Sequence, residues 1–168
     1  PALNPLPHLI RLVAVATGFF LGHQFDRGFV TQGRIDSNAG VGRVSDGFVR
    51  ALFMCMGHLA KVDGRVSEDE IRAARLVMHQ LDLSPAQVRR AIHWFDDGKK
   101  SGFPLVQVVR ELRRVHARRQ SQRLMFVRLL LEVVLAKKRF GKRERALVWS
   151  ICTELDIGRV ELAQLEAM

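Results

Sequence analysis

Residues 56–71 read Met56-Gly57-His58-Leu59-Ala60-Lys61-Val62-Asp63-Gly64-Arg65-Val66-Ser67-Glu68-Asp69-Glu70-Ile71. They predict a helix, a tight acidic turn and a second helix. Asp63-Gly64 supplies the turn, because glycine tolerates a positive φ. Ser67 and Glu70 form the S-x-x-E pattern of a capping box, which opens the second helix.

The same frame recurs farther along the chain without a gap. The matched stretches are Asp63-Gly64-Arg65-Val66 with Lys137-Lys138-Arg139-Phe140, Glu70 with Glu144, and Leu81-Asp82-Leu83 with Leu155-Asp156-Ile157. The sequence therefore predicts a duplicated helical unit whose second copy has lost its acidic turn. A duplicated scaffold is an architecture and does not by itself define an activity.

The composition indicates a folded, basic protein. The chain has 168 residues, of which 48% are apolar, and a net charge of +10. A chain of this length can form one domain with a hydrophobic core. The positive net charge favours contact with polyanions. Cys55 and Cys152 lie in apolar helical runs without disulfide spacing, so a reducing compartment is expected. Cys55 and His58 are one turn apart, but a buried thiol is favoured over a metal site because no second ligand pair follows.

The rest of the body predicts helices only. No stretch alternates with the period of a strand, so the expected class is all-α with six to seven helices. Trp94 and Trp149 lie on apolar faces and are expected in the core. The expected helices span about 47–62, 67–81, 84–98, 104–115, 121–138 and 142–155, with a short one after Gly158.

The head of the chain differs from the body. Residues 9–22 are apolar except for Arg11 and Thr17, a run shorter than the roughly 20 residues that cross a bilayer. A signal peptide and an apolar helix packed on the domain are alternatives, but we favour a membrane anchor over residues 1–26. Gly18 and Gly22 form a G-x-x-x-G pair that predicts a homodimer through the anchor. Excess Lys and Arg after residue 26 predict a cytoplasmic body.

Residues 27–46 are rich in glycine without sustained periodicity, and we expect a flexible linker there. The helical domain is then expected over residues 47–168.

Several motifs in order resemble one family. Residues 53–70 resemble the first half of the TerB-like domain, specifically that of the DjlA-type membrane-anchored DnaJ-like co-chaperones. The supporting stretches are Leu21-Gly22-His23-Gln24-Phe25-Asp26, Phe103-Pro104-Leu105, Arg110-Glu111-Leu112-Arg113, Arg143-Glu144-Arg145-Ala146 and Glu154-Leu155-Asp156-Ile157.

The resemblance implies a bacterial inner-membrane protein with a cytoplasmic helical domain and a C-terminal J-domain. In that family the His-Pro-Asp loop of the J-domain stimulates the ATPase of DnaK. This chain contains no His-Pro-Asp, so the resemblance implies the anchor and central domain without the part that acts on DnaK. The family's later acidic turn, Ala-Asp-Gly, is here Ala136-Lys137-Lys138, which puts any function that needs two acidic turns in doubt.

The acidic turn is a candidate site for a weakly bound cation or a partner. Its residues are Asp63, Glu68, Asp69 and Glu70. They match the back half of an EF-hand loop, but Leu59 and Lys61 occupy positions that need oxygen ligands. The alternative to a binding site is that these acidic residues only stabilise the N-terminus of the following helix. We expect no tightly held metal and no cofactor.

A basic surface is expected from Arg110, Arg113, Arg114, Arg118, Lys137, Lys138 and Arg139. Stacking aromatics and a nucleic-acid module are lacking, so anionic lipid or plain solvation is favoured over nucleic acid. No catalytic motif is found, and a non-enzyme is expected.

The sequence predicts the membrane-localising and interaction region of a DnaJ-like co-chaperone. The alternatives are a stand-alone TerB-like protein of tellurite or envelope stress, with weak metal binding, and a basic nucleic-acid-binding domain.

Overall fold

The computed structural model describes residues 44–62, 64–137 and 139–168, and this part of the chain contains helices and no strands. The all-α class is therefore confirmed. The helices are α2 (Asp46–Lys61), α3 (Glu68–Gln80), α4 (Pro85–Gly98), α5 (Leu105–Val115), α6 (Gln120–Val134), α7 (Lys142–Glu154) and α8 (Arg159–Glu166).

The expected N-terminal anchor, with Gly18 and Gly22, lies outside the described residues, as does the linker up to residue 43. Within the described ranges no helix is long and apolar enough to cross a bilayer. The predicted fifth helix was too long: α6 ends at Val134, and the chain turns before Lys137.

The helices form two copies of one three-helix unit. We call α2–α4 the first repeat and α6–α8 the second repeat, with α5 connecting them. Glu68 and Lys142 begin α3 and α7 at corresponding positions. After each of these helices one aspartate has a left-handed backbone conformation: Asp82 with φ 49° and Asp156 with φ 60°. The duplication expected from the sequence is thus also present in the backbone.

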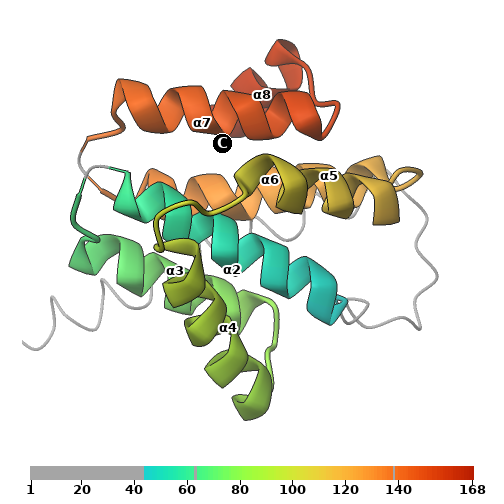
Figure 1. The fold of residues 1–168 in the computed structure, drawn as a ribbon. Coiled ribbons are helices and arrows are strands. Elements are labelled where there is room, and N and C mark those ends of the chain that lie inside the picture. Colours follow the sequence, from blue (N-terminus) through green and yellow to red (C-terminus); the bar gives the residue numbers. More distant parts are fainter. Residues whose placement is uncertain (1–43, 63, 138) are drawn as a thin grey trace, which may run out of the picture. The chain divides into compact units, whose positions relative to one another are not determined.

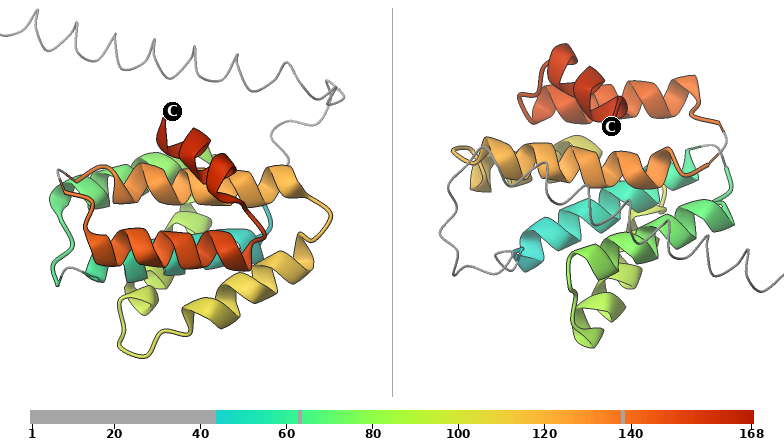
Figure 2. Two further views of the ribbon diagram at one scale, coloured as in Figure 1. Left: turned by 90° about the horizontal axis from the view of Figure 1, so that it is seen from above. Right: turned by 180° about the vertical axis from the view of Figure 1, so that it is seen from behind.

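The two first helices of the repeats form the centre of the core. Figure 1 shows α7 and α8 stacked above α6, with α2, α3 and α4 below it, and Figure 2 gives the same order from behind. Phe48 of α2 and Phe126 of α6 meet edge to face, with ring centroids 5.6 Å apart. Both side chains are buried, as are most apolar residues of these two helices.

Two glycines let α2 and α4 cross with their backbones in contact. A Cβ atom on Gly57 would lie 2.0 Å from the carbonyl oxygen of Phe95, and one on Gly98 would lie 1.9 Å from that of Met54. In the second repeat the position of Gly57 is taken by Leu131, which is buried.

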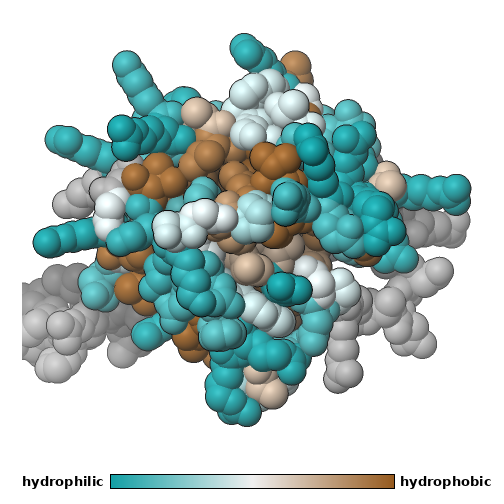
Figure 3. Space-filling model, in the orientation of Figure 1, coloured by the Kyte–Doolittle hydropathy of each residue, from teal (hydrophilic) through white to brown (hydrophobic). Residues whose placement is uncertain are grey.

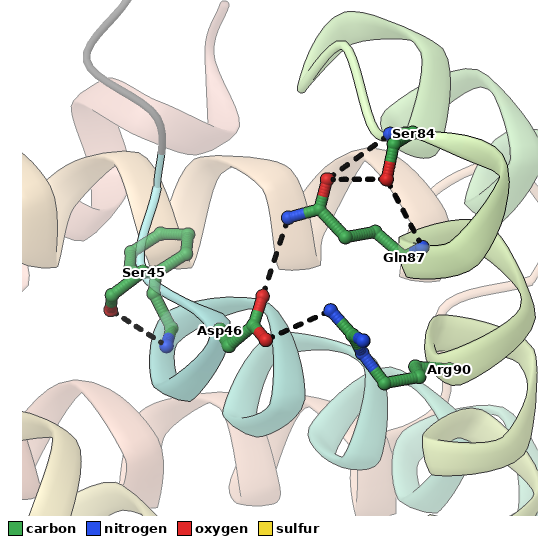
Figure 4. Close-up of polar contacts among 6 residues, drawn as sticks. Ser45, Asp46, Ser84, Gln87 and Arg90 are labelled. Carbon is green, nitrogen blue, oxygen red and sulfur yellow. Dashed lines mark hydrogen bonds and ion pairs between the residues drawn. The ribbon is translucent and has the colours of Figure 1, made fainter.

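Side chains also tie the start of α2 to α4 (Figure 4). The Asp46 carboxylate accepts hydrogen bonds from Gln87 Nε2 at 3.3 Å and from Arg90 Nη2 at 2.9 Å. Gln87 also closes the capping box of α4, since its Oε1 accepts from Ser84 N at 3.1 Å. The start of α2 is thereby held to the first turns of α4.

The second repeat makes the same tie with reversed polarity. Gln120 corresponds to Asp46, and Glu161 corresponds to Gln87. Here the amide stands on the first helix and the carboxylate on the third, because Gln120 Nε2 donates to Glu161 Oε1 at 2.7 Å.

Candidate functional site between the repeats

Two glutamates, one in each repeat, are aimed inward by the start of their own helix. Glu70 Oε2 accepts hydrogen bonds from Ser67 N at 2.9 Å and Ser67 Oγ at 2.8 Å. Glu144 Oε2 accepts from Gly141 N at 2.7 Å. These are N-terminal capping contacts, and they fix both side chains while engaging only one oxygen of each carboxylate.

The second oxygens of both carboxylates face the same ammonium group. Lys137 Nζ lies 3.7 Å from Glu70 Oε1 and forms a closer ion pair with Glu144 Oε1. Both glutamates are fully buried, and the Lys137 side chain is 12% exposed. We call Glu70, Lys137 and Glu144 the inter-repeat charge centre.

The charge centre brings together two carboxylates and one ammonium group. Two buried carboxylates face one ammonium group, so the three groups carry a formal net charge of −1. A buried ion pair costs desolvation of both partners, and loss of one partner leaves an uncompensated charge. The centre therefore holds α3 and α7 in a fixed relation to the loop that carries Lys137.

The described residues of the predicted acidic turn, Glu68, Asp69 and Glu70, do not converge on one point. Asp63 lies outside the described residues. Glu68 is exposed, and Asp69 pairs with Arg72 at 3.4 Å on the surface of α3. Of the three that the structure describes, Glu70 alone is buried. In the described part of the chain, no three His, Cys, Asp or Glu side chains are grouped to hold a metal ion.

The predicted basic surface is smaller than its sequence suggested. Lys137 does not belong to it, because its ammonium group is drawn inward by Glu70 and Glu144. Lys138 lies outside the described residues, whereas Arg113, Arg118 and Arg139 are exposed.

Two further arginines of that surface are neutralised by carboxylates. Arg110 forms a two-point contact with Glu154, at 2.8 and 3.2 Å, and Arg114 does the same with Glu111, at 3.0 and 2.7 Å. The hydrogen bond from Arg110 lowers the pKa of the Glu154 carboxyl below its ordinary value. Figure 3 shows apolar side chains among the hydrophilic ones on one face of the domain.

The thiols are buried and the tryptophans only half-buried. Burial raises the pKa of Cys55, and it raises that of Cys152 to about 12, so both thiols stay protonated. Trp94 and Trp149 pack against the core from its edge, short of the full burial expected. The Arg159 guanidinium lies 5.0 Å from the centre of the Trp149 ring.

An apolar groove of about 350 Å³ lies between α2 and α5, lined in part by Ala51, Met54, Val108 and Leu112. Its lining also includes His116, which is 7% exposed and whose pKa is lowered by burial. No sequence motif marked this groove.

The sequence did contain a signal for the charge centre. Glu70 and Glu144 correspond in the two repeats, and both stand three residues after an N-cap. The sequence did not predict the role of Lys137, because the run Lys137-Lys138-Arg139 is typical of a solvated surface.

The fold and its charge centre define a duplicated all-α domain joined by paired capping glutamates. Residues 50–167 match the family described as "Tellurite resistance protein TerB". The chain belongs to this TerB family. No solved structure matches it significantly.

Curated relatives give a more specific similarity. The chain is 31% identical to the "Co-chaperone protein DjlA" of Pasteurella multocida, covering 90% of this chain and 53% of that protein. It is 30% identical to the protein of that name from Coxiella burnetii, covering 92% and 59%. The Photorhabdus laumondii protein is 32% identical, over 92% and 56%. The chain thus spans little more than half of the relatives it matches.

Proposed function

We propose that this chain is the membrane-localising and interaction region of a DnaJ-like co-chaperone, and that it has no catalytic activity of its own. Its first 26 residues would hold it at the bacterial inner membrane, with the helical domain in the cytoplasm. DnaK would be engaged only through a J-domain that this chain does not contain.

One observation carries the proposal. Similarity to proteins named as DjlA co-chaperones extends over about nine-tenths of the chain, beyond the residues that match the TerB family. The match therefore includes sequence N-terminal to residue 50, where the apolar run lies. A similarity confined to the helical domain would have favoured the TerB family in general.

The membrane role is tested by fractionation of cells that produce the full chain or a form lacking residues 1–26. We expect the full chain in the carbonate-resistant membrane fraction and the shortened form in the soluble fraction. A helical circular dichroism spectrum of the shortened form, lost cooperatively on heating, would show that the helical domain stays folded. A soluble full chain together with an unfolded shortened form would refute the anchor.

The anchor dimer has its own test. Replacing Gly18 and Gly22 together by Leu should weaken self-association in a membrane dimerisation assay, because small residues allow close helix approach in lipid. The double variant should remain in the membrane fraction.

The chaperone role is tested by DnaK single-turnover ATP hydrolysis. The chain alone should give no stimulation. The chain fused at its C-terminus to a J-domain should stimulate, and the same fusion with the His of His-Pro-Asp replaced by Gln should not. Stimulation by the chain alone would refute the proposal that DnaK is engaged only through a J-domain.

The family description supports a second candidate, a role in tellurite resistance independent of any J-domain. Cells that produce this chain alone would then tolerate more potassium tellurite than cells with the empty vector. We expect equal sensitivity of the two strains under the first proposal.

A further inference from the structure

We propose that the ammonium group of Lys137 is a built-in counter-ion that occupies a cation site formed jointly by the two repeats. Removing this group would open the site to a small divalent cation such as Ca²⁺ or Mg²⁺. The wild-type domain, by contrast, would need no metal at this position.

The site is built before any cation arrives. Capping bonds orient Glu70 from α3 and Glu144 from α7, at 2.9 Å from Ser67 N and 2.7 Å from Gly141 N. These bonds engage Oε2 of each side chain and leave Oε1 to bind a cation. Paired carboxylate oxygens of this kind are the ligands that hard divalent cations prefer.

Lys137 fills that position incompletely. Its Nζ atom is closely paired with Glu144 but remains 3.7 Å from Glu70 Oε1. Lys137 offers a single positive charge to the two described carboxylates, whereas a divalent ion would offer one charge to each. Among the described residues, the ion pairs of Glu70 and Glu144 are made with Lys137 alone. Without its ammonium group, two buried negative charges would face each other.

One pair of matched positions differs in charge between the two repeats. The residue of the first repeat that corresponds to Lys137 is Asp63, an acid. The two copies therefore carry opposite charges at one matched place, while Glu70 and Glu144 are the same in both. In the second copy the lysine supplies a cation from the chain itself, so occupancy of the site does not depend on the ionic conditions.

The test measures thermal unfolding of the purified full chain with chelator, with Ca²⁺ and with Mg²⁺. The melting temperature of the wild type should be the same in all three. Lys137→Ala should melt lower than the wild type in chelator. Its melting temperature should rise saturably with either cation, because a ligand that binds only the folded state stabilises it.

Two further variants make the result specific. Lys137→Ala combined with Glu144→Gln should lose the response to cation, because one ligand is gone. Lys142→Ala removes an exposed lysine nearby and should behave as the wild type. Titration calorimetry of Lys137→Ala should show one cation per chain.

Should Lys137→Ala be unfolded in chelator, recovery of its helical circular dichroism on adding Ca²⁺ or Mg²⁺ supports the proposal, and no recovery refutes it. A Lys137→Ala melting temperature that ignores both cations also overturns it. So does a wild type that either cation stabilises.

Discussion

In the first repeat α4 crosses α2 with backbone against backbone at Gly57, whereas in the second repeat the position of Gly57 is held by a buried leucine, Leu131. Yet α3 and α7 begin at matched residues and are followed by the same left-handed aspartate. The copies agree where short-range chain geometry is set and differ where one helix packs on another. The two units thus share the geometry of their helix ends more closely than their helix packing.

The largest effect is expected when Gly57 of the first repeat is replaced by leucine, the residue at the matched position of the second repeat. Gly57→Leu should destabilise the chain by about 3 kcal/mol or more, because a Cβ there would lie 2.0 Å from a backbone oxygen of Phe95. Urea unfolding measures the loss. Gly47→Ala is the matched control in the same helix, since its Cβ would lie 3.9 Å from Ser45 Oγ. It should leave stability unchanged or slightly raised, and a similar loss in both variants would contradict the role of the close crossing.

The two glutamates of the charge centre should also be unequal. Glu144→Gln is expected to cost about 1–3 kcal/mol and Glu70→Gln less than about 1 kcal/mol, because Glu144 makes the closer pair with Lys137. An amide oxygen can still accept the capping bond in each variant, while the amide nitrogen replaces the oxygen that faces Lys137. Chemical denaturation of the two variants side by side gives the order, and a larger loss for Glu70→Gln would reverse our assignment.

The two aspartates with a left-handed backbone conformation allow a test of the feature that the repeats share. Asp82→Gly and Asp156→Gly should each stabilise by up to about 1 kcal/mol, because φ values of 49° and 60° suit glycine better than aspartate. Ala at either position should destabilise. Melting temperatures that move in opposite directions in the two glycine variants would show that the turns are not equivalent.

The smallest expected effect comes from reversing one polar tie. Gln87→Glu alone brings a second carboxylate to Asp46, at a cost of about 0.5 kcal/mol for this exposed site. Adding Asp46→Asn should recover most of that loss, since the pair then has the polarity of Gln120 and Glu161. A double-mutant cycle measures the coupling, and a coupling of zero would mean that the tie is incidental.

Much of this fold could be predicted from local sequence patterns. The S-x-x-E and S-x-x-Q boxes of Ser67 and Ser84 placed the starts of α3 and α4, because a capping box involves only residues three apart. The repeat was visible for the same reason.

Contacts between distant residues could not be predicted in this way. The buried pair of Lys137 with Glu144 forms beside Glu70, which is far away in the sequence, and no local pattern distinguishes Lys137 from its basic neighbours. The role of Gly57 likewise depends on which helix crosses it.

The opposite polarity of the two ties has a consequence for how the chain reaches its native state. Similar repeats in one chain can exchange partners while folding. If α2 docked onto α8, Asp46 would meet Glu161, and two carboxylates would face each other. If α6 docked onto α4, Gln120 would meet Gln87 and Arg90, and the carboxylate that accepts from them in the native pair would be missing. Correct pairings match an amide or guanidinium with a carboxylate, so the chain carries a modest bias against misassembly of its own halves.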